Sequence, residues 1–296
     1  MKILVTGSEG QLGRDLMPRL EKAGYEVCGH DVSSLDITDT AKTVEAVAGL
    51  KPFAIINCAA YTQVDKAEAE SEAAYAVNKQ GAASLAQAAA NIGARLLHIS
   101  TDFVFDGRKS TPYAEDDQVS PISVYGASKL AGEQAIISCL PEHIIVRTAW
   151  LYGAQGNNFV KTILRLAAER ESLNIVYDQI GTPTWTTDLC DALVLTVKAL
   201  ESGKTPYGIY HYTNEGVASW YDFAVEIVEE ALARGLAIKC KTLEPILTSG
   251  YPTPAARPAF SVLDKAKFKK TFGVNIPHWR GSLKRMMNEL CGGERA

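Results

Sequence analysis

The chain opens with Lys2-Ile3-Leu4-Val5-Thr6-Gly7-Ser8-Glu9-Gly10-Gln11-Leu12-Gly13, the stretch that decides its fold. Its first residues form a short apolar run with enough β-forming side chains for a buried strand. Glycines at three-residue spacing follow, and Leu16, Met17 and Leu20 then recur with the period of a helix. Strand, glycine turn and helix in this order predict a dinucleotide-binding loop, in which small residues let the backbone approach a pyrophosphate at a helix N-terminus. The spacing is GxxGxxG rather than the commoner GxGxxG, so a merely structural turn is the alternative.

The second strand, predicted over residues 25–30, bears on the choice of cofactor. It ends at Asp31, 18 residues after Gly13. An acidic residue about 20 residues beyond the glycines commonly binds the adenosine ribose and disfavours a 2′-phosphate. Arg14 points the other way because a guanidinium suits such a phosphate, although an exposed arginine in the first helical turn is an equal alternative. The sequence therefore predicts NADH or NADPH and does not choose between them.

Tyr125 and Lys129 lie four residues apart in Val124-Tyr125-Gly126-Ala127-Ser128-Lys129. In a helix, residues at this spacing share a face, so the phenol and the ammonium can point into the same space. A nearby cation stabilises a phenolate and lowers its pKa from the usual value of about 10. We therefore expect Tyr125 to donate or accept a proton near neutral pH. For the pair alone, an aromatic residue beside a solvated lysine is the alternative.

Strand-like and helix-like segments alternate through the first half of the chain. Further strands are predicted at residues 53–57, 95–100 and 143–147, and helices at 71–92 and 123–137. This alternation predicts an α/β fold with a Rossmann-type, doubly wound parallel sheet, in which ligands bind beyond the carboxyl ends of the strands. The segments that directly follow the three later strands are Ala59-Ala60-Tyr61, Thr101-Asp102 and Thr148-Ala149-Trp150. We expect them to meet the glycine loop at one edge of the sheet.

Beyond about residue 165 the alternation weakens and the loops lengthen. Helices are predicted at residues 187–200, 219–233 and 279–290. We expect a dinucleotide-binding domain over residues 1–165 and a smaller C-terminal α/β lobe over residues 166–296, which closes over the sheet edge and holds the substrate. The boundary is soft, because one of these helices can return to the first domain. One large α/β unit is the alternative.

Composition excludes several classes of protein. The chain has 296 residues, is 47% hydrophobic and 22% charged, and has a formal net charge of −4, so no basic surface suggests nucleic acid. No apolar run approaches the roughly 20 residues of a membrane span, and no signal-peptide pattern precedes the first strand. The six cysteines show no CxxC pairing and the five histidines are scattered. Reduced thiols in a cytoplasmic protein are therefore a better interpretation than disulfides or a metal site.

Several motifs together resemble the extended short-chain dehydrogenase/reductases. Thr6-Gly7-x-x-Gly10-x-x-Gly13, Asn57-Cys58-Ala59-Ala60, Ser100-Thr101 and Tyr125-x-x-x-Lys129 are similar to the family as a whole. Within this family, the chain resembles the nucleotide-sugar reductases in residues 10–13, 60–68, 100–107, 125–133, 147–152, 156–159, 178–184 and 251–258. These segments span nearly the whole chain. The resemblance implies NAD(P)H-dependent reduction of the C4 ketone of dTDP-4-dehydro-L-rhamnose to dTDP-L-rhamnose, the last step of dTDP-rhamnose synthesis.

The resemblance also implies roles for single residues. The pyrophosphate of the cofactor would be held by Gly10, Gln11 and Leu12, its adenosine end by Asp31, Asp36 and Ile37, and its middle by Ala59, Ala60 and Tyr61. Thr101 would hydrogen-bond the substrate C4 oxygen and Tyr125 would protonate it. Lys129 would hold the nicotinamide ribose while it lowers the pKa of Tyr125. The deoxysugar would contact Thr101, Asp102 and Trp150.

Each substrate residue has a structural alternative. Judged alone, Thr101 is a strand-end hydroxyl that bonds its own backbone, and Trp150 is as much a core residue as a ligand. Arg257, in proline-rich surroundings, is either a loop staple or a ligand of the substrate diphosphate, and we favour the ligand.

Two departures from the family bear on the site. Phe103 stands where the family often has tyrosine, which removes a hydroxyl from the substrate side. Some members bind magnesium between subunits through glutamates near the first helix, but Asp15 is the one acid in residues 12–15. We therefore predict no metal; a homodimer is compatible with the sequence, which does not specify its interface.

Rival functions share this scaffold. An epimerase would keep its NAD bound through the cycle. A 4,6-dehydratase needs an Asp-Glu pair after the threonine, where this chain has Asp102-Phe103. A non-catalytic NADP-binding regulatory subunit is the remaining alternative, against which the presence of Thr101, Tyr125 and Lys129 counts.

Overall fold

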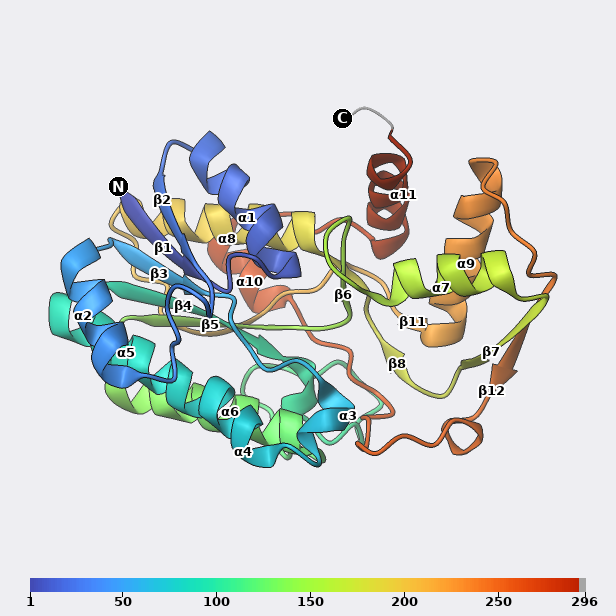
Figure 1. Cartoon of the computed structure of the whole chain (residues 1–296), viewed down its shortest axis with the longest axis horizontal. Coiled ribbons are helices and arrows are strands. Elements are labelled where there is room, and N and C mark those ends of the chain that lie inside the picture. The colour runs from blue at the N-terminus through green and yellow to red at the C-terminus, as the bar shows by residue number, and fades with distance from the viewer. Residues whose placement is uncertain (293–296) are drawn as a thin grey trace.

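A six-stranded parallel sheet forms the larger part of the computed structural model, which describes residues 1–292 (Figure 1). From edge to edge its strands are β10 (Gly208–His211), β5 (His143–Thr148), β4 (Arg95–Thr101), β3 (Ala54–Asn57), β1 (Lys2–Thr6) and β2 (Glu26–His30). Every adjacent pair is parallel. The central strands are buried along almost their whole length because both faces of the sheet are covered.

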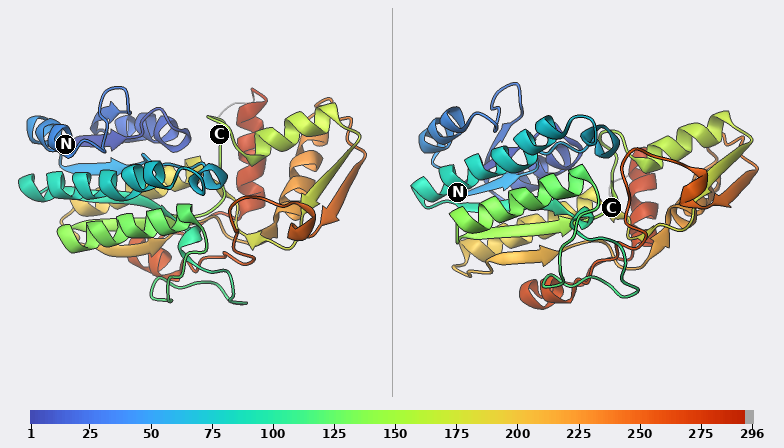
Figure 2. Two further views of the ribbon diagram at one scale, coloured as in Figure 1. Left: turned by 60° about the horizontal axis from the view of Figure 1, so that its bottom comes forward. Right: turned by 90° about the horizontal axis from the view of Figure 1, so that it is seen from below.

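Helices cover the two faces, which confirms the doubly wound, Rossmann-type sheet (Figure 2). One face carries α1 (Gln11–Lys22), α8 (Thr186–Glu201) and α10 (Ala266–Phe272). The other carries α2 (Thr40–Leu50), α5 (Ala82–Ile92) and α6 (Val124–Cys139). Apolar side chains on the covering helices, such as Leu16 of α1 and Leu193 of α8, complete the core.

The helix predicted over residues 71–92 is interrupted by a wider turn. It consists of α4 (Ser71–Tyr75), the π-helical segment η1 (Ala76–Gly81) and α5. Such turns occur frequently at functional sites. Here the wide turn carries Asn78, which is buried and reaches the loop after β3.

The order of the strands opens the sheet at the carboxyl ends of β1 and β3. The chain runs from β1 to β2 on one side and then to β3 on the other, so the connections leave in opposite directions. The glycine loop fills this point. Gly7 has a φ of +68°, and a Cβ there would lie 2.6 Å from the backbone nitrogen of Ala59. A Cβ on Gly13 would lie 2.3 Å from Gly7 O, so Gly13 is required for the helix to pack on the loop.

The smaller lobe lies beyond the carboxyl ends of the strands (Figure 1). It contains α7 (Phe159–Glu169), α9 (Trp220–Ala233) and α11 (Trp279–Leu290), together with the parallel pair β7 (Ser172–Val176) and β12 (Thr242–Ile246). The pairs β6 (Leu151–Tyr152) with β9 (Thr184–Trp185), and β8 (Ile180–Gly181) with β11 (Ala218–Ser219), join it to the sheet. The short elements are α3 (Val64–Ala67), η2 (Asp102–Val104) and η3 (Thr248–Gly250). The predicted smaller α/β lobe is confirmed.

Three elements beyond residue 165, β10, α8 and α10, pack with the first part of the chain. β10 forms an edge of the main sheet and α8 lies against α1. The sheet and its helices are therefore built from segments that are discontinuous in sequence. The boundary that the sequence predicts between two domains at residue 165 stays a prediction.

None of the helices within residues 1–292 combines the length and the apolar character that crossing a membrane would require. All six cysteines lie in this part of the chain and are free.

The packing of α8 on α1 can be tested at Leu193, which is buried between them. We expect Leu193→Ala to lower the free energy of unfolding by about 2 to 5 kcal/mol, because it leaves a cavity under the sheet. Denaturant unfolding followed by circular dichroism measures this. Leu232→Ala, at an exposed position of α9, is the control and should change little. Equal effects of the two substitutions would contradict the packing described.

Candidate active site

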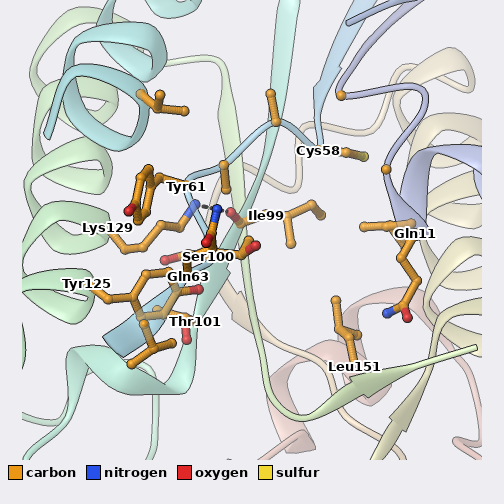
Figure 3. Close-up of a pocket in the computed structure, with 18 of the residues that line it drawn as sticks. Gln11, Cys58, Tyr61, Gln63, Ile99, Ser100, Thr101, Tyr125, Lys129 and Leu151 are labelled. Atoms are coloured by element: carbon orange, nitrogen blue, oxygen red, sulfur yellow. Dashed lines mark hydrogen bonds between the residues drawn. The ribbon is translucent and has the colours of Figure 1, made fainter. Parts of the chain in front are cut away.

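A cavity of about 870 Å³ lies between the carboxyl edge of the sheet and the smaller lobe. Its walls include almost all residues singled out from the sequence: Gly7, Gly10, Gln11, Leu12, Asp31, Asp36, Ile37, Ala59, Ala60, Tyr61, Thr101, Asp102, Tyr125, Lys129, Trp150 and Arg257. Tyr125, Lys129 and Thr101 lie on one side of it, and Gln11 and Leu151 lie on the other (Figure 3). One continuous space thus joins the glycine loop to the Tyr125 helix.

The glycine-loop end suits a diphosphate. Gly10 is the N-cap residue of α1, and no side chain in the described part of the protein caps this helix. The N–H groups of its first turn and the positive end of the helix dipole are therefore available to an anion. A loop of the smaller lobe lies over this end, where Asn158 Nδ2 donates to Gln11 Oε1 at 2.9 Å. Residues and space here fit a dinucleotide.

Carboxylates mark the adenosine end of the cavity. Asp31 Oδ2 accepts a hydrogen bond from the backbone N–H of Glu9 at 3.1 Å and so ties β2 to the glycine loop. Asp36 accepts from both the N–H and the hydroxyl of Thr38. Arg14 is exposed on α1 and is not part of the cavity wall.

The middle of the cavity is shaped by Asn78 of the π-helical turn. Its Oδ1 accepts from the N–H of Tyr61 at 2.9 Å, and its Nδ2 donates to the carbonyl of Tyr61 at 3.1 Å and to Ser128 Oγ at 2.9 Å. One side chain therefore fixes the loop after β3 against α6. The Tyr61 hydroxyl donates to Glu70 at 2.5 Å, and this hydrogen bond raises the pKa of Tyr61 to about 12.

The N-terminus of α6, which carries Tyr125, is fixed by two capping groups. Ser123 Oγ accepts from the N–H of Gly126 at 3.2 Å, and Glu68 Oε1 accepts from the N–H of Val124 at 2.9 Å. A Cβ on Gly126 would lie 2.2 Å from Phe103 O, so α6 packs closely on η2. Phe103 meets the Tyr125 ring edge-on, with 5.5 Å between ring centroids.

Tyr125 and Lys129 do not act on each other as the sequence suggested. The Tyr125 side chain is half-buried, but protein surrounds its phenol, and this desolvation raises its pKa to about 12; a hydrogen bond with Thr101 opposes the rise. Lys129 is fully buried and its Nζ donates to the carbonyl of Ile99 at 2.7 Å. Burial lowers the pKa of Lys129 to about 8. The expected lowering of the Tyr125 pKa by Lys129 is therefore wrong for this structure, because the amine points to strand β4.

Thr101 and Asp102 form a buried polar pair beside Tyr125. Thr101 Oγ1 donates to Asp102 Oδ1 at 3.1 Å and accepts from the N–H of Phe103 at 3.2 Å, so its local backbone role is real. Asp102 is 2% exposed. Within residues 1–292 its Oδ2 makes no hydrogen bond of ordinary geometry, although the Ser261 hydroxyl interacts with the carboxyl group and opposes the rise of its pKa. Burial raises the pKa of Asp102 to about 6. A buried carboxyl oxygen without a well-formed hydrogen bond suits a hydroxyl donor from a ligand.

Trp150 stacks on Trp220, a cavity residue that the sequence analysis missed. Their ring centroids are 3.5 Å apart with 6° between the planes. Trp150 has a φ of +48°, which is strained for a bulky residue and is typical of functional positions. It follows β5, whereas Trp220 begins α9, so the pair spans the two parts of the molecule. Nothing local in the sequence marks Trp220, because its partner is distant along the chain.

Arg257 has both features that the sequence left open. It lines the cavity, and its guanidinium pairs with Asp65 of α3, with Nη2 at 2.8 Å from Oδ2 and Nη1 at 3.0 Å from Oδ1. This pair lowers the pKa of Asp65 and staples the loop of residues 251–258 to the larger part of the protein.

Comparison with known proteins now places the chain. The sequence pattern of the family described as RmlD substrate binding domain matches residues 1–291. The dTDP-4-dehydrorhamnose reductase of Aggregatibacter actinomycetemcomitans is 46% identical over 287 residues, which are 96% of this chain and 98% of that protein. The chain belongs to the dTDP-4-dehydrorhamnose reductase family.

Two solved structures of the family have the same fold. That of the dTDP-4-dehydrorhamnose reductase from Clostridium acetobutylicum is 43% identical and matches with a TM-score of 0.92, covering 98% of this chain and 100% of that one. That from Bacillus anthracis, in complex with NADP, is 40% identical with a TM-score of 0.90, covering 97% of this chain and 99% of that one. The resemblance found in the sequence is thus confirmed over nearly the whole chain.

The shifted pKa of Asp102 predicts a stability change. Because its folded pKa of about 6 exceeds the ordinary 3.8, its contribution to the free energy of unfolding is full below about pH 4 and is lost as pH rises through about 6. Asp102→Asn removes the buried charge. We expect it to raise the free energy of unfolding at about pH 7 by about 2 kcal/mol, measured by denaturant unfolding.

Asp106→Asn is the matched control for this measurement. The backbone N–H of Arg108 lowers the pKa of Asp106, so its ionised form is favoured in the folded protein and the amide should bring no gain. A loss of stability in Asp102→Asn at neutral pH would contradict the burial argument.

Proposed function

We propose that this protein catalyses the NAD(P)H-dependent reduction of the C4 ketone of dTDP-4-dehydro-L-rhamnose to dTDP-L-rhamnose, the final step of dTDP-L-rhamnose synthesis. One observation carries the proposal. A single cavity connects the glycine loop at one end to Tyr125, Thr101 and Asp102 at the other, in a chain that belongs to this reductase family over nearly its whole length.

The residues of the cavity divide the proposed reaction between them. A bound nicotinamide cofactor supplies the hydride to C4. Tyr125 remains protonated well above neutral pH, so it acts as the acid and transfers its hydroxyl proton to the developing C4 alkoxide. Thr101, which lies beside it, turns its hydroxyl proton from Asp102 Oδ1 to the same oxygen and so orients the ketone. Lys129, which lies one turn after Tyr125 on α6, holds the nicotinamide ribose.

The substrate is held by groups from both parts of the molecule. The stacked Trp150 and Trp220 offer an apolar surface to the deoxysugar. Asp102 Oδ2 accepts a hydrogen bond from a sugar hydroxyl. Arg257 meets the substrate diphosphate while its ion pair with Asp65 keeps the loop in place.

The cofactor is NADPH or NADH. Asp31 lines the adenosine end and Arg14 lies outside the cavity wall, which supports the use of NADH. The NADP complex of the Bacillus anthracis relative supports NADPH.

The proposal also includes a cytoplasmic location, independence of metal ions and a homodimer. The free thiols support a cytoplasmic protein. Within the described residues, no cluster of three potential ligands suits a metal ion. The predicted independence of metal and the homodimer stay predictions.

The proposal is tested by oxidation of NADPH, and separately of NADH, with enzymatically generated dTDP-4-dehydro-L-rhamnose. We expect loss of reduced-nicotinamide absorbance that requires both substrates, with dTDP-L-rhamnose as the product. The two rates also rank the cofactors. Cofactor binding without turnover would support a regulatory subunit instead, and purified protein that retains its NAD would support an epimerase.

Tyr125→Phe should separate chemistry from binding. Because it removes the proton donor and keeps the ring, we expect turnover to fall by roughly 100- to 10,000-fold while cofactor affinity is retained. Steady-state rates and cofactor fluorescence titrations measure the two effects. Tyr177→Phe, at an exposed position, is the control. Full turnover in Tyr125→Phe would remove Tyr125 from the mechanism.

Arg257→Gln and Asp65→Asn distinguish a ligand from a staple. If Arg257 contacts the diphosphate, its loss should raise KM roughly tenfold or more with a smaller change in kcat, because a charge-assisted hydrogen bond to substrate is lost. Asp65→Asn breaks the ion pair but keeps the guanidinium, so we expect a smaller rise in KM. Equal rises would show that Arg257 acts through the loop alone.

A further inference from the structure

A chain of buried polar side chains leads from the first strand to Lys129. Thr6 and Asn57 end β1 and β3, His98 lies beside Asn57 in the middle of β4, and each of the three is 1% exposed. Thr6 Oγ1 donates to Asn57 Oδ1 at 2.8 Å, and Asn57 Nδ2 lies 3.0 Å from His98 Nδ1. His98 Nε2 lies 3.3 Å from Lys129 Nζ. The reaction proposed above uses only the last of these four residues.

The orientation of the Asn57 amide is fixed by its neighbours. The backbone N–H of Ala59 points at Asn57 Oδ1 at 3.0 Å, and a backbone N–H can only donate. The atom it meets must therefore be the carbonyl oxygen and not the amide nitrogen. Asn57 consequently presents its NH₂ group, a donor, to His98.

The protonation of His98 is determined by this donor. Nδ1 must accept from Asn57, so it carries a lone pair and no proton. A cationic His98 would set an N–H against the NH₂ group of Asn57. Burial, and the charge that Lys129 carries when protonated, also lower the pKa of His98 well below its usual value. His98 is therefore neutral, with its proton on Nε2, the nitrogen that faces Lys129.

This tautomer of His98 favours a lone pair on Lys129 over a third N–H group. An ammonium has three N–H groups and no acceptor, so it would oppose the N–H of His98. A neutral amine accepts from His98 Nε2–H and still donates to the carbonyl of Ile99 at 2.7 Å. We propose that Lys129 of the cofactor-free protein gives up its proton far more readily than a free lysine, because its neutral amine accepts a hydrogen bond from His98, with Asn57 as the residue that fixes the direction of this bond.

Among the other ionisable groups around Lys129, Glu133 and Cys58 favour its ammonium, but burial outweighs them. Glu133 on α6 is paired with Arg147 at 2.7 Å and accepts from Ser100, so its charge is already balanced. Burial raises the pKa of the Cys58 thiol and of the Tyr125 phenol to about 12, so both are neutral. The lowered pKa of Lys129 agrees with this arrangement.

This inference about the protonation of Lys129 deepens the proposed function. Only its consequence for cofactor binding rests on that function. In the reductase, Asn57 and His98 are positioning residues that set the protonation state in which Lys129 meets the cofactor. If Lys129 binds the ribose as an ammonium, it takes its proton from solvent when the cofactor enters at a pH above the lowered pKa of Lys129. Binding of the cofactor would then become weaker as pH rises.

The first test is the ¹⁵N spectrum of His98 in the free, full-length protein, assigned by the signals lost in His98→Gln. We expect Nε2 to carry the proton and Nδ1 to carry none. The Cε signal of ¹³C-labelled Lys129, assigned by Lys129→Arg, should titrate near or below about pH 8. A proton on Nδ1, or a Lys129 midpoint at the ordinary value of about 10.4, would overturn the proposal.

Asn57→Asp tests the direction of the bond with a nearly isosteric change. A carboxylate accepts from His98 Nδ1–H, so Nε2 turns its lone pair to Lys129 and stabilises the ammonium. We expect the proton affinity of Lys129 to rise roughly tenfold or more. The double variant Asn57→Asp with His98→Met keeps the new charge but removes the ring, so most of the rise should disappear.

An equal rise in both variants would show that charge alone acts and would overturn the role of His98. If Asn57→Asp does not fold, the histidine spectrum of the unchanged protein still decides the tautomer. All these measurements are made without substrate or cofactor. A failure here is therefore distinct from a failure of the reductase assay.

Discussion

The contact between the glycine loop and the end of β3 is the constraint on which the site depends. Gly7 adopts a left-handed backbone conformation, and its α-carbon lies so close to Ala59 that no side chain fits between them. Because β1 and β3 are neighbours, this contact places the free end of α1 directly over the point where the sheet opens. The glycine loop, the Ala59–Tyr61 segment and the Tyr125 helix can line one cavity only because the two backbones approach this closely.

Burial sets the chemistry of the other end of the cavity. It shifts Tyr125, Lys129 and Asp102 each toward the uncharged form, in opposite directions of pKa for acids and for the amine. A phenol that keeps its proton is an acid ready to donate, and the buried carboxyl of Asp102 is ready to accept a hydrogen bond from a hydroxyl. The cost of desolvating these groups is carried by the free protein, as is common at sites that are organised before the ligand arrives.

The sequence predicts the strands of the first half, the glycine loop and the Tyr125 helix to within a residue or two, because their patterns are local. It did not reveal α2 or β10, nor the roles of Trp220, Asn78 and Glu68. Glu68 caps α6 from 56 residues away, and no spacing rule reports such a contact. The i, i+4 spacing correctly placed Tyr125 and Lys129 on one helix, but it cannot tell which group the lysine amine bonds. The groups that contact this amine are His98 and Ile99 of strand β4, about 30 residues away in the sequence.

The conformation of the loop after β3 depends on the π-helical turn in the neighbouring helix, and so on the number of residues in that helix. Asn78 reaches both backbone groups of Tyr61 only because the turn is wider than an α-helical one. Removing one residue between Tyr75 and Gly81 would restore regular α-helical winding and take away the extra width that carries Asn78 toward Tyr61. Asn78 and Ser128 would then no longer face each other across the gap. This helix therefore tolerates substitution on its outer face far better than any change in its number of residues.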